Sequence, residues 1–143
     1  MELNVKLESM ELIEESFKNN KNFLEDISET VKANMNNSFR IGTMTNLEEN
    51  KEKIAVEYNF NIVQRDSENN KEISELNITY IATFDDVDNT IISKMNQNKL
   101  NDEELRLLIS NLSKLAYPYI KDYMELKYNK ANMKIKLPLE LSV

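Results

Sequence analysis

The apolar residues of this chain change their spacing near residue 100, from about every second residue to about every 3.6 residues. An alternating pattern is typical of strands that bury one face, and a period of 3.6 is typical of a helix with one apolar side. The chain is therefore expected to form strands first and a long helix afterwards.

The clearest strand is predicted near the middle of the chain, where apolar and polar side chains alternate. Glu57, Asn59 and Asn61 are expected on its polar face. The polar residues 66–70 separate this run from a second alternating run, so the two should pair as an antiparallel hairpin. The apolar positions of the two runs are Ile54, Val56, Tyr58, Phe60 and Ile62, followed by Leu76, Ile78, Tyr80, Ala82 and Phe84.

Two more strands are expected before this hairpin. Phe39, Ile41 and Thr43 indicate one of them, joined to the hairpin through the polar loop 46–53. Near the N-terminus the apolar positions alternate and then change parity, which fits a strand with a bulge. The positions concerned are Leu3, Val5, Leu7, Met10 and Leu12. A four-stranded antiparallel sheet follows from these runs.

Two segments are ambiguous. Residues 19–37 combine helical spacing with many asparagines, which fits a short helix or a partly ordered connection. Residues 85–98 fit a short helix packed on the sheet or a loop that shields apolar surface. The apolar residues in question are Phe23, Leu24, Ile27 and Val31 in the first segment and Val87, Ile91, Ile92 and Met95 in the second.

A long helix is predicted from residue 101. Asn101 can cap its first turn, with Glu104 as the reciprocal partner, and Leu100 and Leu105 suit a hydrophobic staple. One apolar stripe is expected to face the sheet. Its members are Leu105, Leu108, Leu112, Leu115, Tyr119 and Tyr123, widened by Ile109, Ala116, Ile120 and Leu126.

The end of this helix and a proline within it also carry information. Pro118 lies between Tyr117 and Tyr119 and predicts a kink, because proline removes a backbone hydrogen bond. Asn129 is expected to end the helix in the left-handed conformation. Alternating apolar residues then predict a final short strand or extended segment, with Met133, Ile135 and Leu137 on one side.

Composition excludes several classes of function. The 143 residues fit a single domain, and 25 acidic against 18 basic residues give a net charge of -7, unsuited to binding nucleic-acid phosphates. No run of about 20 apolar residues is present, and the N-terminus does not resemble a signal peptide, so a soluble cytoplasmic protein is expected. Because the chain has no cysteine, disulfide and thiolate chemistry are excluded.

The usual catalytic groups are also missing. The chain contains no histidine, and its single glycine, Gly42, cannot form a phosphate-binding loop. The neighbouring carboxylates Asp85 and Asp86 could bind a hard cation or act in acid–base chemistry, although a turn with solvated charges explains them as well. We therefore expect neither an enzyme, nor a bound metal, nor a cofactor.

Residues 112–139 resemble the C-terminal half of the SecB-type export chaperones. The resemblance lies in Tyr117-Pro118-Tyr119 with Ile120-Lys121-Asp122, and in the later Leu137-Pro138-Leu139. Residues 13–17, Ile-Glu-Glu-Ser-Phe, are similar to part of the first strand of that family. The order of four antiparallel strands, a long helix and an extended apolar segment agrees with the same α+β fold, in which the helix packs on the sheet.

The resemblance implies a chaperone that works without ATP. Such a protein holds unfolded or preprotein clients by covering their apolar segments, as a homodimer or homotetramer, with a SecA-like translocase motor as a further partner. An extended apolar groove binds many sequences without strict specificity. The alternative is a structural or adaptor protein of the same fold that binds one defined partner.

Candidate binding residues follow from this implied function. Apolar residues outside the regular stripes are candidates for a client-binding groove or for lids over the core: Leu47, Val87, Ile91, Met133, Ile135 and Leu137. For Tyr117, Tyr119, Tyr123 and Leu126 we expect an oligomer interface, and core packing explains the tyrosines equally. Glu11, Glu14 and Glu15 could dock a basic partner, or could form a charged strand face in water.

Overall fold

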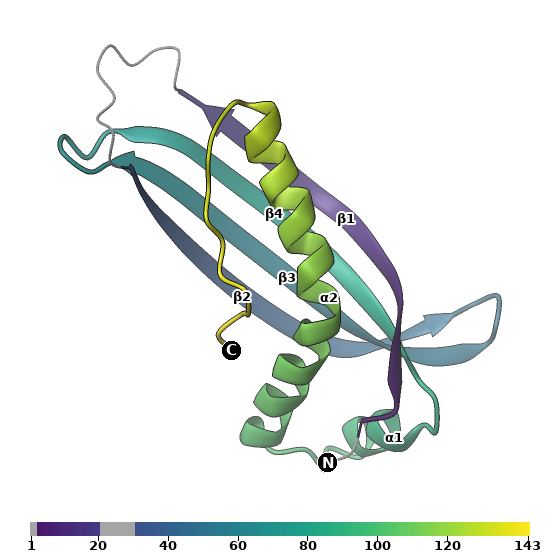
Figure 1. The fold of residues 1–143 in the computed structure, drawn as a ribbon. Coiled ribbons are helices and arrows are strands. Elements are labelled where there is room, and N and C mark those ends of the chain that lie inside the picture. The colour runs from purple at the N-terminus through teal and green to yellow at the C-terminus, as the bar shows by residue number, and fades with distance from the viewer. Residues whose placement is uncertain (1–2, 21–30) are drawn as a thin grey trace.

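The computed structural model describes residues 3–20 and 31–143. Four strands form one antiparallel sheet in the order β1-β4-β3-β2, and a long helix covers one face of it (Figure 1). The predicted α+β arrangement is therefore confirmed. The elements are β1 (Val5–Asn19), β2 (Val31–Asn46), β3 (Lys51–Asp66), β4 (Glu72–Asp86), α1 (Thr90–Asn96) and α2 (Asp102–Lys130).

The predicted hairpin is the centre of the sheet. Strands β3 and β4 pair with Tyr58 opposite Tyr80 and Phe60 opposite Ile78, which places the two apolar sets on the same face. All ten apolar positions predicted for these strands are buried. The turn between the strands occupies residues 67–71, in agreement with the polar run seen in the sequence.

Strand β1 contains the predicted bulge and a second one. Its register against β4 shifts between Leu7 and Ser9, where the sequence changes parity, and shifts again between Leu12 and Glu14. Each extra residue moves the following side chains to the other face of the sheet. The second shift decides which acidic side chains face α2.

The interpretation of residues 19–37 needs correction. Asn19 ends β1, and β2 begins at Val31, so residues 31–37 form a strand and not a helix. Val31 pairs with Asp66 and Asn37 with Phe60, and these backbone bonds to β3 outweigh the low strand propensity of asparagine. The predicted helical residues Phe23, Leu24 and Ile27 lie outside the described residues. The loop before β3 is also shorter than predicted, at residues 47–50.

The two faces of the sheet differ in character. The face toward α2 is apolar, whereas the other face carries amide, hydroxyl and charged side chains in cross-strand contacts, such as Asn61 with Asn77 at 2.7 Å. Lys53 is nearly enclosed on this open face, where its Nζ lies 2.7 Å from Glu8, 2.9 Å from Glu49 and 3.4 Å from Asp85. The bonds to Glu8 and Glu49 raise the pKa of Lys53, so the cation is firmly held.

Asp85 and Asp86 point to opposite faces of the sheet and do not form a shared site. Asp85 pairs with Lys51 and Lys53 on the open face. Asp86 is buried on the helix face, and its Oδ2 accepts hydrogen bonds from the backbone N–H groups of Ile91 and Ile92, both at 2.9 Å. These are donors of the first turn of α1, which the sequence had left open between helix and loop.

Helix α2 begins as predicted. The Asn101 side chain accepts from the Glu104 N–H at 2.8 Å, and the Glu104 carboxylate accepts from the Asn101 N–H at 3.3 Å. The helix continues through Pro118 and bends near its middle (Figure 1). Ser113 also lies there, and its hydroxyl donates to the Ile109 carbonyl at 2.6 Å, an arrangement that often bends helices.

The buried row of α2 differs in part from the predicted stripe. Residues spaced four apart face the sheet: Leu108, Leu112, Ala116, Ile120, Met124 and Tyr128. Leu115, Tyr119 and Leu126, which were expected in the stripe, are exposed. A row of residues spaced four apart is inclined to the helix axis, so a helix that buries such a row crosses its support obliquely. Apolar spacing alone did not indicate this inclination.

The end of α2 lies later than predicted. The helix ends at Lys130, and Asn132, with φ 55°, takes the left-handed conformation that had been assigned to Asn129. The chain then turns back and remains extended without joining the sheet as a strand. None of the described helices is long and apolar enough to cross a membrane.

Candidate functional site

An extended stretch of the chain lies in a groove beside α2. We call residues 133–141 the C-terminal segment; it runs back along α2 on the same face of the sheet (Figure 1). Met133 and Leu137 are buried, Ile135 is half-buried, and Lys134 and Lys136 are exposed. The segment therefore buries the side chains of one side in the core and exposes those of the other side. It alternates like a strand at the edge of a sheet, but it forms no strand.

Two side chains hold this segment by its backbone. Gln64 on β3 donates from Nε2 to the Lys134 carbonyl at 3.1 Å, and Tyr117 on α2 donates from its hydroxyl to the Pro138 carbonyl at 2.8 Å. Ser74 in turn donates to Oε1 of Gln64 at 2.8 Å, which orients the amide. Both of these hydrogen bonds are made to backbone carbonyl groups of the segment. They therefore do not depend on which side chains the segment carries.

A row of aromatic rings connects β2 to α2 under this region. Phe39 meets Tyr58 edge to face at 5.6 Å between ring centroids, and Phe60 lies 6.2 Å from both Tyr58 and Tyr117. Burial raises the pKa of Tyr58 and of Tyr117 to about 12. Both hydroxyls therefore stay protonated to a higher pH than an ordinary tyrosine, whose pKa is about 10.

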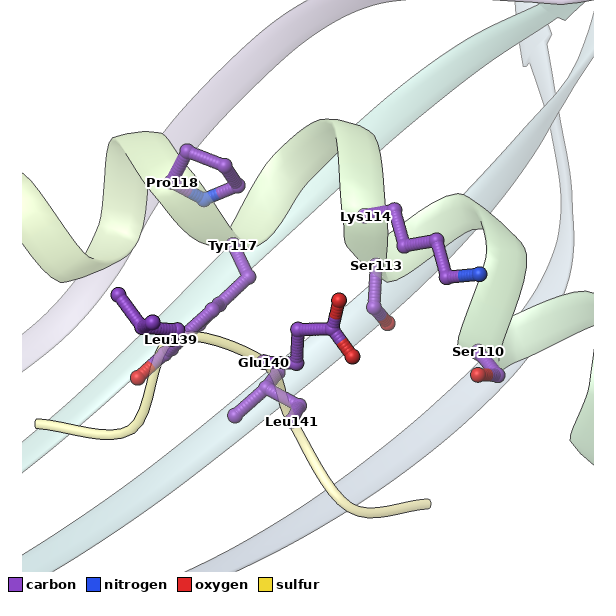
Figure 2. Close-up of a pocket in the computed structure, with 8 residues that line it drawn as sticks. All are labelled: Ser110, Ser113, Lys114, Tyr117, Pro118, Leu139, Glu140 and Leu141. Carbon is purple, nitrogen blue, oxygen red and sulfur yellow. The ribbon is translucent and has the colours of Figure 1, made fainter.

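A small cavity remains between α2 and the end of the C-terminal segment. Its volume is about 250 Å³, and the helix and the segment form its two walls (Figure 2). Its polar groups are the hydroxyls of two serines and one tyrosine, one lysine and one glutamate. The lining residues are Ser110, Ser113, Lys114, Tyr117, Pro118, Leu139, Glu140 and Leu141.

The residues expected at an oligomer interface are separated by the structure. Tyr119 is 63% exposed and Leu126 is exposed, whereas Tyr117 is 1% exposed and belongs to the core. Tyr123 is partly buried, packs edge to face on Tyr80 at 5.7 Å, and donates to the Glu15 carboxylate at 3.1 Å. Leu107 and Leu115 are also exposed, so α2 presents an apolar row along its outer side.

The residues expected in a client groove do not form one patch. Met133, Ile135 and Leu137 belong to the C-terminal segment. Leu47 lies fully exposed in the turn after β2, and Val87 is exposed between β4 and α1. Ile91 lies on α1 and is buried in the core. These six residues therefore occupy four separate places.

The acidic residues expected at a docking surface are divided between the two faces of the sheet. Glu11 and Glu14 lie opposite Ile81 and Thr79, on the open face. Glu15 lies opposite Ile78 on the helix face, where Lys127 Nζ is 3.1 Å from its Oε1. Because of the bulge between Leu12 and Glu14, it is Glu15 and not Glu14 that faces α2.

Sequence reasoning missed the polar residues that continue the buried rows of the hairpin. Gln64 follows Ile62 at the same parity on β3, and Asp86 follows Phe84 at the same parity on β4. Both side chains are buried and hydrogen-bonded. Their parity is the signal that could have identified them, because a polar residue on an apolar face needs a buried partner.

Comparisons with known proteins identify the fold. No protein-family model and no curated protein matches the chain. Among solved structures, the chain is similar to the Mycobacterium tuberculosis Rv1957 SecB-like chaperone in complex with a ChAD peptide from the Rv1956 HigA1 antitoxin. The TM-score is 0.59 at 13% sequence identity, over 97% of this chain and 90% of that chain. The chain therefore has a SecB-like fold.

Proposed function

We propose that this chain of SecB-like fold is a holdase that works without ATP and binds extended apolar segments of unfolded or preprotein clients in the cytoplasm. One observation carries the proposal. The groove between α2 and β3 already holds an extended segment, with two apolar side chains buried and two carbonyls bonded by Gln64 and Tyr117.

This mode of binding suits clients of varied sequence. Backbone carbonyls are common to all peptides, so Gln64 and Tyr117 supply affinity without reading side chains. The apolar contacts add about 25 cal/mol per Å² of buried surface for any residue of suitable size. Methionine is an adaptable side chain for such a surface; Met133 of the segment is buried, and Met35 of β2 is partly buried against the same core.

Self-association is part of the proposal. Leu107, Leu115, Tyr119 and Leu126 form an exposed apolar row on α2, and an exposed row of this kind is typical of a surface between subunits. A homodimer or homotetramer would cover it. Export through a SecA-like motor would place a partner on the open face, where Glu11 and Glu14 lie.

A second candidate function is an adaptor for one defined partner. The similar SecB-like chaperone was solved with a peptide from an antitoxin, and this supports binding of a single specific peptide by a chain of this fold. The two functions differ in promiscuity. A holdase binds several unrelated unfolded chains, whereas an adaptor binds one.

The test is suppression of aggregation. Several unrelated proteins, chemically unfolded, are diluted into buffer with and without the purified chain, and light scattering is followed while multi-angle scattering gives the mass of the assembly. We expect suppression of all clients near a stoichiometric ratio, without nucleotide, by a dimer or tetramer. A folded oligomer that suppresses none of them would exclude the holdase and leave the adaptor.

Two variants separate self-association from folding. Tyr119→Ser, on the exposed row, is expected to lower the mass of the assembly while leaving the circular-dichroism spectrum unchanged. Lys114→Ser is the matched control, since Lys114 is exposed on the same helix and is not part of the apolar row. An unchanged mass for Tyr119→Ser would remove the exposed row as an interface.

A further inference from the structure

The C-terminal segment is held to the domain by few bonds. The turn that begins it is closed by the Met133 N–H, which donates to the Tyr128 carbonyl at 2.9 Å. Within the described part of the chain, the later residues 134–141 form no backbone-to-backbone hydrogen bond. The segment depends on the burial of Met133 and Leu137 and on the two side-chain bonds to its carbonyls.

These contacts have a regular spacing. The buried side chains Met133 and Leu137 are four residues apart, and the bonded carbonyls of Lys134 and Pro138 are also four residues apart. In an extended chain, residues i, i+2 and i+4 point to the same side. An extended chain with apolar residues at i, i+2 and i+4 therefore fits this site, and the segment meets this pattern with Met133, Ile135 and Leu137.

We propose that the C-terminal segment is an internal competitor: it fills the peptide-binding groove, and an extended peptide with apolar residues at i, i+2 and i+4 displaces it. The identity of the ligand rests on the proposed function, whereas the ability of the segment to leave the groove does not. Tethering gives such a segment an effective concentration of the order of mM, so the groove accepts a peptide only when that peptide outcompetes the segment.

The first experiment asks whether the segment leaves the groove while the domain stays folded. Because the chain has no cysteine, single variants report on single positions. Leu137→Cys reports on the buried side of the segment, and Leu112→Cys reports on the core between the sheet and the helix. Lys136→Cys reports on an exposed position of the segment. We expect thiol labelling of Leu137→Cys to be at least tenfold faster than that of Leu112→Cys and slower than that of Lys136→Cys.

Equal rates at Leu137→Cys and Leu112→Cys would overturn the proposal, because the segment would then leave only when the whole domain unfolds. Should Leu112→Cys fail to fold, Ala116→Cys serves as the core reporter, since the two residues are both buried on α2 and alanine is closer in size to cysteine.

The second experiment tests competition. A fluorescent peptide with the sequence of residues 131–143 is titrated into the full-length chain, and anisotropy gives its affinity. Leu137→Asp, which weakens the resident segment, is expected to bind the peptide at least tenfold more tightly than the unaltered chain does. Lys136→Ser is the control in the same segment, because the Lys136 side chain is exposed and the substitution changes the net charge by the same one unit; its affinity is expected to equal that of the unaltered chain.

Excess unlabelled peptide should also accelerate labelling of Leu137→Cys without changing Lys136→Cys. A peptide that binds without altering the labelling of Leu137→Cys would occupy another site, and the proposal would be wrong. Displacement by the peptide, together with a failure to suppress aggregation, would reject the holdase and retain the internal competitor.

Discussion

At the scale of single residues, a few polar side chains on the apolar face decide how the C-terminal segment is held. Gln64 and Tyr117 each give one hydrogen bond to a carbonyl of the segment, and Ser74 fixes the amide of Gln64. A buried polar group costs free energy unless it is hydrogen-bonded. Gln64 and Tyr117 would lose their acceptors if the groove were empty, so they disfavour the empty state. Under the proposed function, the same pair would serve both packing and peptide recognition.

Removing the Tyr117 hydroxyl tests this role. Tyr117→Phe leaves the ring in the core and deletes the bond to the Pro138 carbonyl, so we expect a loss of about 1 kcal/mol in the free energy of unfolding. Tyr119→Phe is the control, since the exposed Tyr119 side chain should change stability by less than about 0.5 kcal/mol. Guanidinium unfolding curves compare the two, and equal stabilities would show that the hydroxyl contributes nothing.

At the scale of elements, helix α1 depends on a residue outside itself. Asn89 precedes it in the left-handed conformation and offers no side-chain cap. Asp86, at the end of β4, accepts the N–H bonds of Ile91 and Ile92 instead and joins the helix to the sheet. A residue that satisfies two first-turn donors acts as a cap even though it lies three residues before Asn89.

Substitution of Asp86 should therefore loosen α1. Asp86→Ala is expected to cost about 1 to 2 kcal/mol, because two buried N–H groups lose their acceptor. Asp86→Asn keeps a side-chain oxygen at the same place and is expected to retain most of the stability. Hydrogen exchange at the Ile91 and Ile92 amides measures the loosening of α1 in each variant. Chemical denaturation measures the change in stability of the whole chain. Similar exchange rates in the two variants would argue against the cap.

At the scale of the whole molecule, the domain is a sheet with one apolar and one polar face. Helices α1 and α2 and the C-terminal segment lie on the apolar face, and several tyrosines take part in that core. Burial raises the pKa of Tyr58, Tyr80, Tyr117 and Tyr128 to about 12, whereas an unfolded chain has tyrosines near 10. The folded state therefore holds these protons more tightly than the unfolded state does.

Stability should consequently fall in alkaline solution. For groups with a raised folded-state pKa, the stabilisation is fully present below pH 10 and is lost as pH rises from 10 toward 12. Denaturation curves at pH 9, 10 and 11 measure this decline. Tyr58→Phe removes one of the buried phenols and should make the decline shallower. An unaltered slope in Tyr58→Phe would mean that this tyrosine does not contribute.

Much of the fold could be predicted from the sequence because it depends on local spacing. Alternation sets which face of β3 and β4 is buried, a parity change in β1 marks its first bulge, and Asn101 with Glu104 defines the start of α2. These signals act within one element, through backbone geometry that repeats every two or every 3.6 residues. The SecB-like arrangement follows from their order along the chain.

The candidate site was predicted less well because it depends on contacts between elements. The inclination of the buried row on α2 places Leu115 and Tyr119 outside, and the second bulge of β1 turns Glu15 toward Tyr123. The asparagine-rich start of β2 is a strand because β3 supplies its hydrogen bonds. None of these outcomes is encoded in the spacing of one segment.

The sequence by itself determined the alternating pattern of the two central strands, the long helix and the alternating apolar residues of the C-terminal segment, since each follows from the spacing of residues near one another along the chain. Tertiary structure alone decided that this segment occupies the groove beside α2. Its hydrogen-bond partners, Gln64 and Tyr117, are distant in sequence and meet its carbonyls only after the sheet and the helix have packed.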